Sequence, residues 1–308
     1  MAALRRRSDP GEASRVTHVV LFEIGHTTTY TFSRSVYLEP HTVRLRPRSD
    51  ASQRLIRFEL QIEPKPAGIS DCLDLEGNCV TQAWFEGLTG SLRVATRSEV
   101  ATLRENPFDY ILGDPTVDRL PVKYAEDLRP SLVPYCSRDT SETRVADFAQ
   151  AVADEVDRQP LPFLASLNCR ICEMCEVTIR EEGDPQAPGT TLKDQRGACR
   201  DLAVLFIDAC RAVGLGARFV SGYQEGGPGQ ERRYLHAWAE VYLPGGGWRG
   251  YDPTLGLAVA DRHVALAAAV RPGLAAAITG TFRGTGVSSR IQADVEIQVS
   301  DGAKPYGS

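Results

Sequence analysis

Gly197-Ala198-Cys199-Arg200-Asp201 is the segment that decides the fold of the second half of this chain, because a stretch with apolar residues at helical spacing follows it. These apolar residues share one face and end just before Gly214, a residue typical of helix ends; they are Leu202, Leu205, Phe206, Ala209, Cys210 and Val213. Cys199 therefore falls in the first turn of a predicted amphipathic helix. Unpaired N–H groups at a helix start favour an anion, so this position suits a reactive thiolate.

Two predicted strands follow this helix and carry the other residues that a cysteine nucleophile needs. Residues 235–243 alternate in the manner of a strand, and His236 lies near the start of the run. A glycine turn at 245–247 leads to a returning strand, which ends at Asp252 because a proline follows. In a cysteine triad the Cys attacks a carbonyl, the His transfers its proton and the Asp orients the imidazole. The sequence thus predicts Cys199, His236 and Asp252 as catalytic residues.

Four segments in this order resemble the core of the bacterial transglutaminase-like proteins: residues 197–201, 217–223, 236–238 and 251–254. By this resemblance Cys199, His236 and Asp252 fall on the catalytic Cys, His and Asp of that family. The fold that the resemblance implies is α+β, with a papain-like cysteine peptidase core. Bacterial members with this core are mostly regarded as cysteine-peptidase-like, whereas the related animal enzymes transfer acyl groups and need calcium.

The oxyanion of an acyl-transfer reaction needs two donors, and the sequence offers one with a clear position. The backbone N–H of Cys199 lies at the predicted helix start, where it can donate to a developing negative charge. Gln195 carries the nearest upstream side-chain amide and is predicted as the second donor or a support. Animal transglutaminases use an upstream Trp here, but no Trp lies between Trp84 and Cys199.

The first part of the chain, residues 16–105, is predicted to form a small antiparallel β domain. Short alternating runs separated by turn residues indicate its strands, at 27–32, 41–47, 55–62 and 81–85. Glu76-Gly77-Asn78 is a predicted hairpin turn. Tyr30, residues 44–47 and Gly77-Asn78 also resemble the N-terminal β domain that commonly precedes the transglutaminase-like core in bacteria.

Residues 106–138 are rich in proline, which predicts an extended connector, and residues 139–308 are assigned to the catalytic core. Within the core we expect helices at 141–156, with Thr140 or Ser141 as N-cap, and at 164–173, then a strand at 175–180. The last clean alternation, at 291–299, predicts a strand that closes the core sheet.

Length and composition narrow the classes of function. The chain has 308 residues, enough for two domains that each bury a core, and a formal net charge of −5. No strong field of either sign indicates nucleic acid or an anionic membrane as a partner. No apolar run approaches the roughly 20 residues of a membrane span, and the basic start at residues 5–7 lacks the apolar segment of a targeting signal. We expect a cytoplasmic protein whose eight cysteines are mostly reduced.

Cys169, Cys172 and Cys175 are the strongest competing signal, since a C-x-x-C-x-x-C run can hold an iron–sulfur cluster. The ferredoxin pattern needs a fourth cysteine followed by proline, and this chain has Ile179-Arg180 there. A zinc site also lacks an evident partner pair, and no EF-hand loop for calcium occurs. We therefore expect packing roles for these cysteines, and no metal or cofactor.

The function predicted from the sequence is a cysteine-dependent hydrolase that acts on an amide or peptide carbonyl through a thioester. Two alternatives stay open: a protein-glutamine acyltransferase, and a non-catalytic binding or scaffold protein with the same fold. The intact triad disfavours the scaffold. The charged residues near the motif, Arg200, Asp201 and Arg218, are predicted to form ion pairs or hydrogen bonds that fix the backbone of the site.

Overall fold

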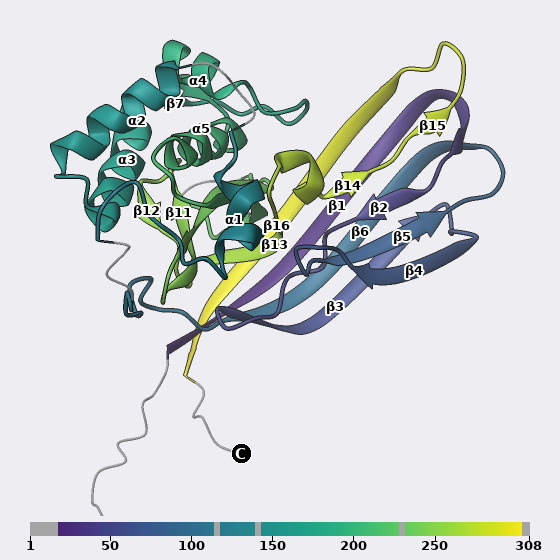
Figure 1. The fold of residues 1–308 in the computed structure, drawn as a ribbon. Helices are drawn as coiled ribbons and strands as arrows, with labels where there is room; N and C mark the ends of the chain where they lie inside the picture. Colours follow the sequence, from purple (N-terminus) through teal and green to yellow (C-terminus); the bar gives the residue numbers. More distant parts are fainter. Residues whose placement is uncertain (1–17, 114–117, 139–142, 228–231, 304–308) are drawn as a thin grey trace, which may run out of the picture.

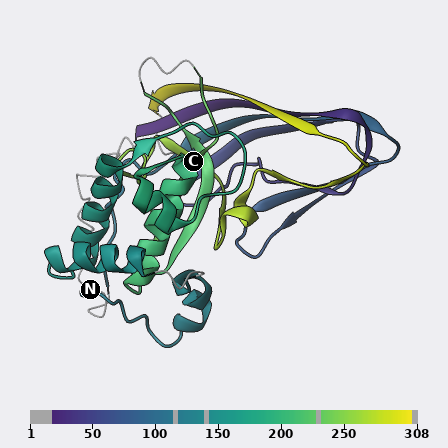
Figure 2. The ribbon, with the colours of Figure 1, turned by 90° about the horizontal axis from the view of Figure 1, so that it is seen from above.

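The computed structural model describes residues 18–113, 118–138, 143–227 and 232–303. A helix-covered sheet lies at one end of the molecule, and a long β domain extends from it (Figure 1). Seen from above, the helices gather on one side of the core sheet, away from the long strands (Figure 2). This α+β architecture, with an antiparallel N-terminal domain, confirms the fold class predicted from the sequence.

The β domain is a sandwich of two antiparallel sheets. The larger sheet has five strands: β1 (His18–Leu38), β3 (Gln53–Glu63), β6 (Thr89–Thr102), β15 (Phe282–Arg283) and β16 (Ser289–Ala303). The smaller has four: β2 (His41–Val43), β4 (Gly68–Leu73), β5 (Cys79–Trp84) and β14 (Ile278–Thr279). Alternate residues such as Phe22, Leu45 and Leu92 are buried between them. The predicted hairpin turn joins β4 to β5, and Gly77 supplies its positive φ of 75°.

The last long strand pairs with the first, not with the core sheet. β16 runs antiparallel to β1 from His18 opposite Ala303 to Phe32 opposite Ser289, and the two lie side by side in Figure 1. The prediction that residues 291–299 close the core sheet is therefore wrong. Period-two alternation shows which face of a strand is buried but not which strand it pairs with. The apolar face of β16 packs into the β-domain core, so the chain leaves that domain and returns to it.

The core contains a five-stranded antiparallel sheet in the order β12-β11-β10-β9-β13. Its strands are β9 (Ala217–Gln224), β10 (His236–Leu243), β11 (Gly247–Asp252), β12 (Leu257–Ala258) and β13 (His263–Ala269). Three helices enclose its apolar cluster: α2 (Arg144–Glu155), α3 (Pro160–Met174) and α5 (Cys199–Ala212). Smaller elements complete the domain: α4 (Pro188–Asp194), β7 (Glu176–Val177), β8 (Arg196–Gly197) and the 3₁₀ turn η2 (Pro272–Ala275). No described helix has the length and apolar composition that crossing a bilayer requires.

The proline-rich segment between the domains is more ordered than an extended connector. It contains α1 (Arg129–Cys136), and Leu120 and Val122 are buried in the core cluster. The hydroxyl of Tyr124 donates to the carbonyl of Tyr242 and accepts from the N–H of Gly216, just before β9. The predicted strand at 175–180 is reduced to the two residues of β7, and the predicted N-cap at Thr140 or Ser141 lies outside the described residues.

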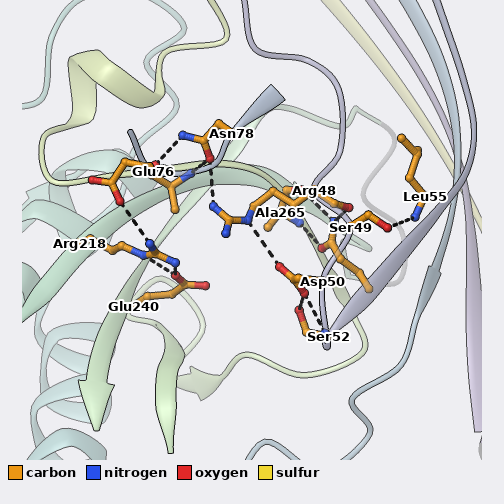
Figure 3. A network of polar contacts seen from close by, with 12 residues as sticks. Arg48, Ser49, Asp50, Ser52, Leu55, Glu76, Asn78, Arg218, Glu240 and Ala265 are labelled. Atoms are coloured by element: carbon orange, nitrogen blue, oxygen red, sulfur yellow. Dashed lines mark hydrogen bonds and ion pairs between the residues drawn. The ribbon is translucent and has the colours of Figure 1, made fainter. Parts of the chain in front are cut away.

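Side chains of the β domain bind the outer edge of β13 as a neighbouring strand would. Gln53 donates to the carbonyl of Ala265 at 2.9 Å and accepts from its N–H at 2.7 Å. Asn78 makes the same pair of bonds with Ala268, at 2.7 and 2.9 Å. Part of this network is drawn in Figure 3. The edge of the core sheet is thus covered without a further strand, and β13 is held in place by the β domain.

A buried ion cluster joins the two domains beside this edge. The guanidinium of Arg218 lies 3.2 Å from the carboxylate of Glu76, at the tip of the β4–β5 hairpin, and 2.7 Å from that of Glu240 in β10 (Figure 3). It also lies 4.2 Å from the centre of the Trp248 ring. Arg218 therefore forms the ion pairs that were predicted for it from the sequence.

Candidate active site

Cys199 is the first residue of α5, and a buried carboxylate fixes the turn before it. Asp201 Oδ2 accepts from the N–H of Ala198 at 2.8 Å, and Oδ1 accepts from Arg180 at 2.6 Å. A Cβ added at Gly197 would lie 2.8 Å from the Cβ of Asp201, so the chain needs glycine there. The local sequence 197–201 thus positions the thiol at the helix start, where the first backbone N–H groups have no partner within the helix.

His236 begins β10 and Asp252 ends β11, which brings them together at one end of the sheet. The imidazole Nε2 lies 2.7 Å from Asp252 Oδ2. Asp252 is fully buried, and its Oδ1 accepts from the N–H of Thr254 at 2.9 Å. The remaining ring nitrogen, Nδ1, is left for the thiol of Cys199, which lines the same cavity and contributes to the raised pKa of this imidazole. The three residues predicted from the sequence therefore meet in the order Cys199, His236, Asp252.

Burial and neighbouring groups shift the pKa values of His236 and Asp252 in opposite directions. Burial alone lowers the pKa of His236, but the Asp252 carboxylate and the Cys199 thiol outweigh it and raise the pKa to about 10. Burial alone raises the pKa of Asp252, but His236 and a second histidine, His263, hold it well below its usual range. His236 therefore favours the imidazolium form at neutral pH.

His263 is the site residue that sequence reasoning missed. It is buried at the start of β13, and its Nε2 lies 3.0 Å from the same Asp252 oxygen that contacts His236. Its Nδ1 is buried without a hydrogen-bond partner among the described residues. The only sequence signal for it is a histidine that opens an alanine-rich strand, and nothing in that pattern indicates a partner.

These three groups are also the set of possible metal ligands found in the described part of the chain, with ligand atoms within 4.8 Å of one another. The two nitrogens lie 2.7 and 3.0 Å from the carboxylate oxygen, which are hydrogen-bond distances. Each histidine aims the nitrogen that would bind a metal at this carboxylate. Hydrogen bonds from the two histidines to the Asp252 carboxylate therefore explain the arrangement.

A cavity of about 580 Å³ opens beside the thiol, between the two domains. Cys199 and His236 line it from the core, and β1 and β16 contribute His26, Ala293 and Val295 from the β domain. His26 is buried, bonds the hydroxyl of Tyr223 at 2.7 Å and has its pKa lowered to about 4 by burial, so it is neutral at pH 7. The β domain therefore forms one wall of the candidate active site.

Gln195 lies apart from the triad. It is exposed at the end of α4, where its left-handed φ of 49° reverses the chain, and it is not among the residues that line the cavity. The geometry therefore gives its side chain no part in the oxyanion site. The backbone N–H of Cys199 stays the predicted oxyanion donor at the helix start.

The three neighbouring cysteines are distributed along α3 and its end. Cys169 is exposed, Cys175 is buried, and Cys172 Sγ lies 3.5 Å from the carbonyl of Thr254. They form no possible metal-ligand group among the described residues. All eight cysteines of the chain are free thiols. Packing explains Cys172 and Cys175, because the former lies against the loop that follows Asp252 and the latter in the core cluster.

Two sequence profiles match the chain in succession. The profile of the bacterial transglutaminase-like N-terminal region matches residues 22–101, and that of the transglutaminase-like superfamily matches residues 142–253, which include the whole triad. The protein belongs to the transglutaminase-like superfamily.

Known proteins match this chain over different shares of its length. An uncharacterised Mycobacterium tuberculosis protein is 28% identical over 258 residues, or 79% of this chain and 81% of the relative. A Pseudomonas aeruginosa protein-glutamine gamma-glutamyltransferase is 35% identical over 123 residues, or 34% of this chain and 18% of that enzyme. A solved Cytophaga hutchinsonii structure, provisionally described as a cysteine protease, has a TM-score of 0.65 at 20% identity and covers 94% of this chain and 93% of the other. This transglutaminase-like protein shares its fold with that structure over nearly its whole length.

Proposed function

We propose that this protein hydrolyses amide or peptide bonds through a Cys199 thioester. The observation that carries the proposal is the position of His236, with Nε2 on a buried carboxylate and its imidazole interacting with the thiol at a helix start. This geometry supplies a nucleophile, a proton carrier and an orienting group in contact. The cavity beside the thiol supplies space for an acyl group.

In the proposed reaction the Cys199 thiolate attacks the carbonyl carbon, and the N–H of Cys199 stabilises the oxyanion. The His236 imidazolium gives its Nδ1 proton to the leaving nitrogen as the C–N bond breaks, which leaves a thioester. A water molecule then gives a proton to Nδ1 and attacks the thioester. Cleavage of the C–S bond releases the acid and restores the thiolate and imidazolium. Asp252 keeps the ring oriented throughout.

Acyl transfer to an amine is the second candidate, because one relative is named a protein-glutamine gamma-glutamyltransferase. The first half-reaction would be the same, and an amine would replace water in the second. Hydrolysis is favoured because the cavity mouth is open: Cys199 is only partly buried, and large apolar residues at the mouth are exposed. Water therefore has access to the thioester, whereas transfer requires its exclusion.

The test is to incubate the protein with a mixture of peptide amides, with and without a primary amine, and to identify the products by mass spectrometry. We expect free acids as the main products, and none from a Cys199→Ala variant. Cys172→Ser is the matched control, since it removes a thiol near the same loop but outside the triad. Turnover that survives Cys199→Ala would refute the mechanism. Amine adducts as the main products would indicate the transferase, and no turnover by the folded wild type would indicate the binding protein.

A further inference from the structure

The cavity beside Cys199 has a wall that the catalytic core does not supply. Ala293 and Val295 are two residues apart on β16, so their side chains share the face of the strand that lines the cavity. An isolated bridge joins Arg233 of the core to Val295, which ties this wall to the loop before His236. The strand that returns from the core to the β domain therefore shapes the substrate space.

Part of the cavity lining is apolar and exposed to solvent. Val177 and Ile179 follow the end of α3, and Leu255 follows Asp252; they are 46%, 71% and 39% exposed. Phe219, which is buried, and Ala276 add to this apolar lining. Large apolar residues from separate segments converge on the opening to the nucleophile, an arrangement that favours an apolar occupant.

Three of the charged residues that line the cavity already have polar partners. Arg180 bonds the buried carboxylate of Asp201, and Arg200 donates to two backbone carbonyls at 2.6 Å. Glu181 lies 3.1 Å from Arg232. A charged substrate side chain would have to displace these contacts, whereas an apolar side chain would leave them intact.

We infer that the acyl donor of this enzyme presents a bulky apolar side chain, of the size of leucine or phenylalanine, to a pocket completed by β16. The inference rests on the proposed function for the place of the scissile bond. The inference goes beyond that function by naming the substrate class and by giving the β domain a part in specificity. Ala293 is the specificity-determining residue, because its small side chain leaves the space that the substrate occupies.

Binding can be measured separately from turnover in a Cys199→Ala protein. The probes are fluorescent N-acetylated peptide amides that differ only in one central residue: Phe, Leu, Ala, Glu or Lys. We expect Phe and Leu peptides to bind at least about tenfold more tightly than the other three, the discrimination typical of a hydrophobic pocket. Ala293→Phe in this background should remove the preference, and Gln292→Phe, at the adjacent position that does not line the cavity, should keep it.

A second variant guards against a folding defect. Ile179→Glu changes an exposed rim residue and should also abolish the preference, whereas Leu73→Glu, at an equally exposed position of the β domain, should not. Tighter binding of the Glu or Lys peptide would overturn the inference, as would an unchanged preference in folded Ala293→Phe and Ile179→Glu proteins. Wild-type turnover of the Phe peptide is scored separately. Its absence together with the expected binding pattern would refute the hydrolase and leave the pocket standing.

Discussion

Two buried polar clusters in this protein have similar chemistry and different surroundings. At the domain interface Arg218 pairs with Glu76 and Glu240, and the ring of Trp248 covers its guanidinium. At the site Asp252 pairs with two histidines, and one of them also contacts a thiol that opens onto a cavity. The first cluster is largely buried and does not line the cavity. The comparison shows that a buried carboxylate becomes a candidate for function when the group it binds also contacts a residue that lines a cavity.

The largest effect is expected at the site, from Asp252→Asn. Asparagine keeps the shape but presents the wrong tautomer of His236, so kcat should fall by roughly 10⁴-fold, as for triad carboxylates in general. The measurement is kcat/KM on a peptide substrate, beside a thermal melt of the same variant. Near-wild-type activity with an unchanged melt would remove Asp252 from the mechanism and leave a dyad of Cys199 and His236.

A substitution in the interface cluster should lower stability and leave kcat nearly unchanged. Arg218→Met leaves two buried carboxylates without their cation, which should lower the free energy of unfolding by about 3 kcal/mol. At a temperature where the variant is folded, kcat should be close to that of the wild type. Arg57→Met is the control, because Arg57 pairs with Glu59 on the exposed face of β3 and should cost less than about 1 kcal/mol. Loss of activity without loss of stability would show that the two clusters are coupled.

His263 sharpens the comparison within the site. His263→Leu removes one of the two donors to Asp252 Oδ2, and loss of a hydrogen bond to a charged group should lower kcat about tenfold with little change in KM. His263→Gln keeps a donor and should recover much of the loss. The pH profile of kcat should shift in the leucine variant alone. Equal losses in both variants, with an unshifted profile, would indicate a packing role.

The dependence of stability on pH tests the charge of His236 separately from turnover. Folding raises the pKa of His236 from about 6.5 in an unfolded chain to about 10, so protonation favours the folded state. This stabilisation is fully present below about pH 6.5 and is lost as the pH rises toward 10. Urea unfolding at several pH values should show that wild type exceeds Asp252→Asn by a margin that shrinks over this range. A margin that grows with pH would contradict the ion pair.

Local patterns were sufficient to predict the elements that carry the site. Helical periodicity predicted α5 with Cys199 at its start, and the hairpin pattern predicted the strands of His236 and Asp252. Contacts between distant segments could not be predicted in this way. The partner of β16 and the bond from His263 to Asp252 depend on tertiary packing, which a period-two pattern does not encode.

Local sequence patterns also failed to predict the positions of Gln195 and of the segment that links the domains. Proximity in sequence suggested that Gln195 reaches the oxyanion, but the left-handed turn at this residue leaves it exposed outside the cavity. Proline content suggested an extended connector, yet Leu120 and Val122 are buried in the core. The amide side chains of Gln53 and Asn78 that bind β13 give no signal in the sequence at all, because they match a strand edge that only the fold creates.

Thiol reactivity tests the central claim most directly. Limiting iodoacetamide at pH 6.5, followed by peptide mapping, ranks the eight cysteines by thiolate fraction and access. Burial raises the pKa of Cys175 to about 11, with a contribution from Cys172, and that of Cys210 well above its usual range, so both should stay unlabelled. We predict that Cys199 is labelled first, ahead of the exposed Cys72 and Cys169, and that His236→Ala removes this lead. An inert Cys199 in folded protein, with Cys172 or Cys210 labelled before it, would contradict the assignment of the nucleophile.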